Sequence, residues 1–118
     1  MRQSTRFRRH ALFDEALAVI DSEFSSETLS LSTVARTIAT SRRQLQRVFA
    51  EHGTSFRTEL QHVRMARAAE LLRDGQVSVS TVARAVGYRH PAQFSKAFRR
   101  HHGRPPSELR MEGASLAA

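Results

Sequence analysis

Two short stretches of the chain carry arginine, lysine and glutamine side chains with almost no acidic neighbours. The members are Arg42, Arg43, Gln44, Gln46 and Arg47 in the first stretch and Gln93, Ser95, Lys96, Arg99 and Arg100 in the second. Arginine presents a planar fork of N–H donors that can bind a phosphate group or a guanine edge through two hydrogen bonds. A surface helix selected for stability would mix in Asp and Glu for i,i+4 pairing, yet the only acid is Glu51, at the end of the first stretch. These residue types indicate a surface that binds a polyanion.

The overall charge supports the same chemistry. Nineteen basic residues, eighteen of them Arg, face eleven acidic ones and give a formal net charge of +8. Such a field attracts nucleic acid first and an anionic membrane second, although arginine richness can also follow genome base composition. No run approaches the roughly 18 uncharged apolar residues of a membrane span. Because Asp14 and Glu15 interrupt the N-terminal region, we expect no signal peptide.

No combination of residues predicts catalysis. The chain lacks Cys, which removes thiol nucleophiles, disulfides and thiolate zinc sites. It has no paired-carboxylate, Ser/His/Asp or phosphate-loop motif, and its histidines do not form an HExxH pattern. We therefore expect no enzyme activity, no catalytic residue, no cofactor and no metal site.

The two stretches lie in segments with helical periodicity, and no segment alternates like a strand, so the chain is predicted to be all-α. Seven helices are expected. The first four are a helix at about 7–24, a short helix with Ser32 as N-cap, a helix at 42–51 between Ser41 and Gly53, and a long helix at 55–73. The last three are a short helix with Ser80 as N-cap, a helix with His90 at the cap and Pro91 in its first turn, and a last turn at about 107–111. The expected buried stripe of the long helix is Phe56, Leu60, Val63, Ala68 and Leu71. Residues 113–118 are expected to form a weakly structured tail.

The chain contains an internal repeat. The segment 31–36, LSTVAR, recurs 48 residues later at 79–84 as VSTVAR. In each copy a short helix, a tight turn and a longer helix follow one another, which is the order of a helix-turn-helix unit. Gly87 marks the turn of the second copy, whereas the first copy has Ala39 there. The repeat alone is also compatible with a duplicated helical bundle that has no DNA role.

The second copy resembles the signature of the AraC/XylS family of bacterial transcription regulators, and the resemblance covers about residues 29–110. It is carried by Val82-Ala83, Val86-Gly87-Tyr88, Phe94, Lys96, Phe98, Gly103, Pro106 and Arg110. Two features depart from the family pattern. Leu109 stands where an aromatic residue is usual, and the spacing from Phe49 to Gly53 is one residue shorter than usual.

The resemblance implies one AraC-type DNA-binding domain over residues 1–118, with homeodomain-like helix-turn-helix subdomains. Unit 1 would cover about 29–53, a linker helix 55–73, unit 2 about 77–103 and a C-terminal turn 105–111. The two recognition helices would enter successive major-groove segments of double-stranded DNA. A linker helix of about 19 residues spans about 28 Å, which is compatible with the ~34 Å turn of B-DNA.

The resemblance also implies the contact residues. Those expected to read bases are Arg43, Gln46 and Arg47 in the first recognition helix and Ala92, Gln93, Ser95 and Lys96 in the second. Those expected at phosphates are Ser32, Ser41, Arg42, Ser80, Arg89 and His90. Because Arg suits guanine and Gln suits adenine, while small residues suit the thymine methyl group or DNA shape, the first helix is predicted to carry more direct readout.

Four further arginines lie outside the two recognition helices. Arg64 and Arg110 are expected to brace the fold by hydrogen bonds to helix ends rather than to contact DNA. Arg36 and Arg84 occupy equivalent positions of the repeat, and a solvated role and a phosphate-facing role suit them equally.

The surroundings of the domain stay open. The chain is either a stand-alone regulator or the DNA-binding end of a longer protein. Its basic start, with Arg2, Arg6, Arg8 and Arg9, fits an arm that adds phosphate contacts, part of a linker, or a frayed terminus. RNA polymerase is a second candidate partner, binding as a monomer is permitted, and the expected location is the bacterial cytoplasm, on the nucleoid. A pure interaction module and a nonspecific DNA-coating protein are the rival readings.

Overall fold

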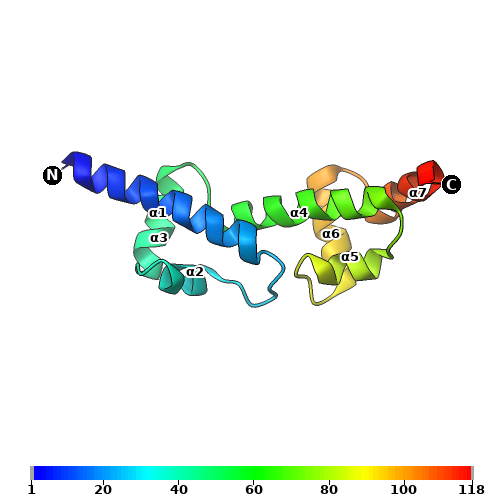
Figure 1. The fold of residues 1–118 in the computed structure, drawn as a ribbon, viewed down its shortest axis with the longest axis horizontal. Coiled ribbons are helices and arrows are strands. Elements are labelled where there is room, and N and C mark those ends of the chain that lie inside the picture. The colour runs from blue at the N-terminus through cyan, green and yellow to red at the C-terminus, as the bar shows by residue number, and fades with distance from the viewer. Residues whose placement is uncertain (1, 118) are drawn as a thin grey trace. The chain divides into compact units, whose positions relative to one another are not determined.

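The computed structural model describes the backbone of residues 2–117 and the side chains of residues 8–116, and it confirms the all-α prediction. Within residues 2–117 it contains seven helices and no strand (Figure 1). In chain order they are α1 (Arg2–Glu23), α2 (Leu31–Thr37), α3 (Arg42–Glu51), α4 (Phe56–Asp74), α5 (Val79–Ala85), α6 (Pro91–His102) and α7 (Pro106–Ala117).

The chain divides into two compact units. The first comprises residues 1–24 and 28–61, and the second comprises residues 25–27 and 62–118. Helix α4 begins in the first unit and ends in the second, as expected of a helix between two subdomains. Each unit contains one copy of the repeat.

The first unit packs α1 against the helix pair α2 and α3. Helix α3 buries Leu45, Val48 and Phe49 along one side, and all three are at most 1% exposed. The Phe49 ring makes edge-on contacts with Phe13 of α1, 5.6 Å away between ring centroids, and with Phe56 of α4, 6.3 Å away. These aromatic contacts determine which side of α3 remains in solvent.

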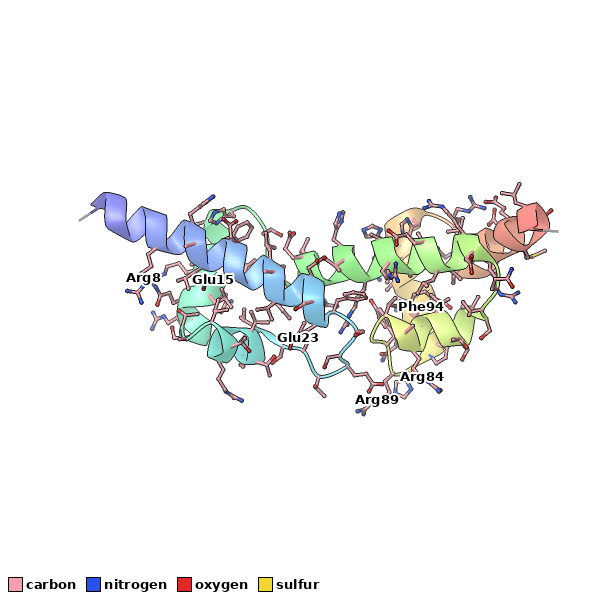
Figure 2. All side chains as sticks on the ribbon, viewed as in Figure 1. Arg8, Glu15, Glu23, Arg84, Arg89 and Phe94 are labelled. Atoms are coloured by element: carbon pink, nitrogen blue, oxygen red, sulfur yellow. The ribbon has the colours of Figure 1, made fainter. Side chains whose placement is uncertain are left out.

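The second unit repeats this arrangement with α5 and α6, and α7 packs against both helices. Phe94 and Phe98 of α6 are fully buried, and their ring centroids lie 5.7 Å apart. Figure 2 shows Phe94 inside this unit, with Arg84 and Arg89 at its outer edge. The apolar side of α6 is therefore occupied, and its polar side is left exposed.

The face of α4 that is buried differs from the predicted one by a rotation about the helix axis. Leu60 and Ala68 are buried as expected, but Phe56, Val63 and Leu71 are only half-buried. The other buried positions of α4 are Met65, Ala69 and Leu72. Adjacent leucines at 71 and 72 make both faces apolar, so periodicity alone does not determine which one packs.

Two predicted helix caps are also wrong, by two residues each. Ser30, not Ser32, caps α2: the Thr33 N–H donates to Ser30 Oγ at 3.1 Å, and the Ser30 N–H donates to Thr33 Oγ1 at 2.9 Å. Ser78, not Ser80, caps α5: the Thr81 N–H donates to Ser78 Oγ at 3.1 Å. The predicted caps Ser41 of α3 and His90 of α6 are confirmed.

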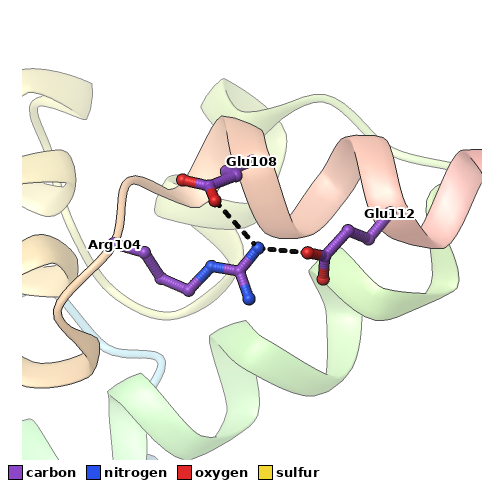
Figure 3. A network of polar contacts seen from close by, with 3 residues as sticks. All are labelled: Arg104, Glu108 and Glu112. Atoms are coloured by element: carbon purple, nitrogen blue, oxygen red, sulfur yellow. Dashed lines mark hydrogen bonds and ion pairs between the residues drawn. The ribbon is translucent and has the colours of Figure 1, made fainter.

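Both ends of the chain are more helical than predicted. Helix α1 begins at Arg2 rather than near residue 7, and α7 runs to Ala117 where a short turn and a loose tail were expected. The reason at α7 is a long-range contact: Gly113 is buried against the backbone of Leu72 and Arg73 at the end of α4. Arg104 adds ion pairs to Glu108 and Glu112, which lie one turn apart on α7 (Figure 3).

The tight turn of the first unit has an unusual backbone. Ala39 has φ of +57°, the left-handed conformation that Gly87 adopts with φ of +96° at the equivalent turn of the second unit. The Thr40 N–H donates to the carbonyl oxygen of Ala35 at 2.9 Å, which closes the turn. The first unit therefore forms this turn at a conformational cost that glycine avoids.

Replacing Gly113 by Ala should destabilise the fold. In an ordinary helix this change stabilises by about 0.5–1 kcal/mol, but here the added Cβ would fall on the carbonyl oxygen of Arg73, so we expect a loss of about 1–3 kcal/mol. Chemical denaturation measures the difference. Ser115→Ala, at an exposed position of the same helix, is the control and should change stability little. A more stable Gly113→Ala variant would contradict the close approach of α7 to α4.

Replacing Ala39 by Gly should stabilise the fold by about 0.5–1 kcal/mol, because glycine adopts positive φ without a steric penalty. Thermal and chemical unfolding would report the gain. The matched control is Ala66→Gly at an exposed position within α4, where the same change should cost about 0.5–1 kcal/mol. Equal effects of the two substitutions would argue against strain at Ala39.

Candidate nucleic-acid interface

The outer face of α3 presents the predicted base-reading side chains. Ser41 begins the helix by accepting a 3.0 Å hydrogen bond from the Gln44 N–H. Because the apolar side is buried, Arg43, Gln46 and Arg47 are all exposed on the opposite side, and so is Arg42. The structure thus brings the predicted residues of the first unit together on one surface.

A shallow depression lies beside this face. Its lining is Arg9, Ser41, Arg43, Gln44 and Arg47. Gln44 is oriented within it by Thr40, whose hydroxyl donates to Gln44 Oε1 at 3.2 Å. Arg9 comes from α1, which lies outside the repeat, so the recognition pattern of the repeat did not identify it.

The predicted base-reading residues of α6 are not all exposed, unlike those of α3. Ala92, Gln93 and Lys96 are exposed, whereas Ser95 is half-buried. A second depression is lined by Ser95, Lys96, Arg99, Arg100 and Pro105. Arg99 and Arg100 were noted as polar-face residues but not assigned to the site; their clustering with Lys96 makes them part of the same basic surface. The last turn of α6, with its exposed carbonyl groups, also favours cations.

The predicted phosphate-binding residues have different surroundings. Ser32 and Ser80 are exposed in the first turns of α2 and α5, one residue after the helix start. Ser80 lines a third depression with Thr81, Arg84 and Ala85. These positions leave both hydroxyl groups available to an approaching phosphate.

Arg89 and His90 precede α6 on an exposed turn. The Arg89 side chain is 71% exposed and pairs with Glu27 at 3.3 Å. His90 is the N-cap of α6 but makes no capping hydrogen bond through its side chain. Pro91 begins the helix and has no N–H to satisfy, so the imidazole is not required for the cap.

Arg64 and Arg110 brace the fold through hydrogen bonds, as predicted, but their acceptors lie in loops and not at helix ends. Arg64 donates to the carbonyl oxygen of Ser26 at 2.8 Å and lies 5.5 Å from the centre of the Tyr88 ring. Arg110 donates through Nε to the carbonyl oxygen of Val77 at 2.7 Å, just before α5. Burial lowers the pKa of Arg64, and nearby Tyr88 partly offsets this effect. Arg104, by contrast, has a raised pKa because Glu112 and Glu108 stabilise its charged form.

Three histidines cluster between α4 and the end of α6. The His101 ring lies 5.5 Å from that of His62 and 4.6 Å from that of His102, measured between centroids. His102 Nε2 is 3.1 Å from the carbonyl oxygen of Met65. Burial lowers the pKa of His101, and the neighbouring imidazoles of His102 and His62 lower it further. Among the described residues, no three His, Asp or Glu side chains are grouped as a metal would require.

Two helix-turn-helix units, each with a basic outer face on its second helix, define a double helix-turn-helix protein. The described helices include none long and apolar enough to cross a membrane. The chain belongs to the AraC-type helix-turn-helix family: the family model described as "Helix-turn-helix domain" matches residues 34–112, more than half of the chain.

Individual relatives agree with this assignment. The chain is 36% identical over 88 residues to the HTH-type transcriptional regulator GlxA of Rhizobium meliloti (strain 1021), which is 74% of this chain and 27% of that relative. It resembles the C-terminal domain of AraT, a response regulator from Geobacillus stearothermophilus, with 34% identity, a TM-score of 0.80 and coverage of 85% of this chain and 84% of that one.

A second solved structure is a transcriptional regulator from Chromobacterium violaceum, described by its AraC-type DNA-binding domain. Its identity is 29% and its TM-score 0.79, with 89% of this chain and 94% of that chain covered. The curated relatives are longer: the chain spans 27% of the GlxA regulator and 37% of the Msm operon regulatory protein of Streptococcus mutans. The similarity therefore concerns one domain of those proteins.

Stability should fall between neutral and mildly acidic pH partly through His101. Its pKa in the folded state lies below the ordinary value of 6.5, so in that window the unfolded chain binds a proton that the folded chain does not. Stability is retained above about pH 6.5 and declines as pH falls toward the lowered pKa. His101→Gln should show a smaller drop in melting temperature between about pH 7.5 and pH 5.5 than the wild type. A drop in His101→Gln as large as that of the wild type would argue against this role of His101.

Proposed function

We propose that this chain binds double-stranded DNA sequence-specifically and serves as the DNA-binding domain of a bacterial transcriptional regulator. Its second helices, α3 and α6, are the recognition helices and enter successive major-groove segments. The observation that carries the proposal is the division of each helix into a buried apolar side and an exposed side with almost no acid. Family membership and relatives named as transcriptional regulators support it.

The two recognition helices read bases in different ways. On α3, Arg43 and Arg47 suit guanine O6 and N7, and Gln46 suits adenine N6 and N7. On α6, Gln93 and Lys96 are the longer exposed side chains, while Ala92 is small enough for a thymine methyl group. Because Ser95 is half-buried, it contributes mainly by allowing the helix to approach the groove. Direct readout is thus stronger in the first unit.

Phosphate contacts position both helices. Arg42 and the helix start at Ser41 serve α3, while Arg89 and His90 serve α6. Ser32 and Ser80 add hydroxyl donors from α2 and α5. Arg99 and Arg100, which share a depression with Lys96, extend the phosphate-binding surface of the second unit.

The wider setting follows from DNA binding. One chain carries two recognition helices, so a single copy suffices for an asymmetric site, and RNA polymerase is a fitting second partner for a regulator. The proposal assigns no catalytic role, and it places the protein on the nucleoid in the bacterial cytoplasm.

Selection of preferred duplexes from a random pool tests the proposal. At physiological salt the selected duplex should bind about a thousandfold or more tightly than a random one, because base contacts add to the shared phosphate contacts. A ratio near one across a salt series would instead identify a nonspecific DNA-coating protein. Failure to bind either duplex would identify an interaction module or a helical bundle without a DNA role.

Substitutions on α3 test the assignment of base contacts. Arg47→Ala and Gln46→Ala should each cost about 1–3 kcal/mol on the selected duplex and relax its preference at one base pair. The control is Arg67→Ala on α4, an exposed arginine that lines none of the three depressions. Equal losses on selected and random duplexes would reassign the residue to a phosphate.

A further inference from the structure

We propose that Arg9 of α1 is an additional DNA contact, which binds a backbone phosphate beside the recognition helix α3. The inference deepens the proposed function and rests on it. Helix α1 precedes the repeat, so neither the repeat nor the recognition pattern of α3 assigns a contact to this helix. The ligand chemistry is a phosphate diester on double-stranded DNA.

Aromatic packing holds α1 in register with the end of α3. Phe13 lies one helical turn after Arg9, and therefore on the same face of α1. Its ring stacks on His52 at 3.9 Å between centroids, with an angle of 5° between the planes, and makes an edge-on contact with Phe49. His52 is held in turn by a 2.9 Å contact from Nδ1 to the carbonyl oxygen of Val48. Arg9 is thus presented to α3 by packed aromatic side chains, Phe13 against Phe49 and His52, and not by a loose arm.

The position of Arg9 within the first depression suits a phosphate. Arg9 shares the lining with Arg43 and Arg47, so three arginines border one depression beside the proposed base-reading face. The Arg9 side chain is 32% exposed. Like charges brought together in this way repel one another, which is unfavourable for the folded chain alone and favourable when an anion binds among them.

Glu51 is the acidic partner of Arg9 in the absence of DNA. Arg9 Nη1 lies 3.0 Å from Glu51 Oε1, and the Glu51 side chain is 38% exposed. Ion pairs near the surface contribute little to stability, so little free energy is lost when Arg9 leaves the carboxylate for a phosphate. A guanidinium group also has five N–H donors, so one contact to Glu51 leaves donors for a phosphate oxygen. Glu51 therefore competes with DNA for Arg9.

A purely structural role makes a different prediction. If Arg9 and Glu51 only joined α1 to α3, removing either partner would have the same effect on DNA binding. If Arg9 contacts phosphate and Glu51 competes, the two substitutions have opposite signs. Arg9→Gln then weakens binding, and Glu51→Gln strengthens it.

The experiment measures affinity for a selected duplex and a random duplex across a salt series. For Arg9→Gln we expect the slope of log Kobs against log salt to decrease by about one, because one phosphate contact is lost. Affinity should fall by a similar factor, about three- to tenfold at physiological salt, on both duplexes. Arg9→Lys should retain the wild-type slope, because a cation remains at the same place.

The matched control is Arg67→Gln. Arg67 is likewise an arginine in an ion pair, 2.8 Å from Glu70, so this variant removes the same charge and the same kind of contact outside the depression. Its salt slope should equal that of the wild type. Circular dichroism on each variant verifies that the helices remain folded.

The possible outcomes separate this inference from the proposed function. If the wild type does not prefer the selected duplex, the proposed function fails whatever Arg9 does. If the wild type keeps its preference but Arg9→Gln leaves the salt slope unchanged, or weakens binding no more than Arg67→Gln does, Arg9 is not a DNA contact. The same conclusion follows if Arg9→Gln and Glu51→Gln change affinity in the same direction.

Discussion

Burial of aromatic side chains from α3 and α6 is the constraint on which the rest of the structure depends. Phe49 in one unit, and Phe94 and Phe98 in the other, are at most 1% exposed. A large ring in a packed core permits little rotation of its helix, because any rotation opens a cavity on one side and creates a clash on the other. The exposed face of each helix is therefore determined by its buried face.

The two units have similar geometry, but they differ in the residue that forms the tight turn. In each unit the first helix of the repeat, α2 or α5, begins at a serine whose hydroxyl accepts a hydrogen bond from the N–H of a threonine three residues later. The turn of the second unit uses Gly87, while the first forces Ala39 into a left-handed backbone. Because packing overrides local preference at Ala39, the core of the first unit must compensate for a strained turn. The two units thus share the backbone conformation of this turn although different residues occupy it.

Features that depend on local pattern, such as the exposed face of α3, could be predicted from the sequence. Helix caps could not be predicted where two nearby serines suit the same role. Ser41 was assigned correctly because its hydroxyl caps α3, and His90 because Pro91 marks the first residue of α6. Serines at 30 and 32, or at 78 and 80, compete for the same role, and the threonine that decides between them lies inside the helix. Helix α7 could not be predicted at its full length, because the contact of Gly113 with the end of α4 joins residues about forty positions apart. The exposure of Arg43, Gln46 and Arg47 on α3 followed directly from its amphipathic spacing, whereas the partial burial of Ser95 depends on tertiary packing.

The arginine content of this chain overstates the charge available to DNA. Arg64 and Arg110 direct their guanidinium groups to backbone carbonyl oxygens of loops, and Arg104 is engaged by two carboxylates of α7. These arginines act as long hydrogen-bond donors that hold loops and helix ends, a task for which the rigid fork of five donors is well suited. A net charge of +8 therefore describes the long-range field, which raises the rate of encounter with a polyanion. Under the proposed function, recognition depends instead on a smaller set of arginines, such as Arg43 and Arg47 on the exposed face of α3.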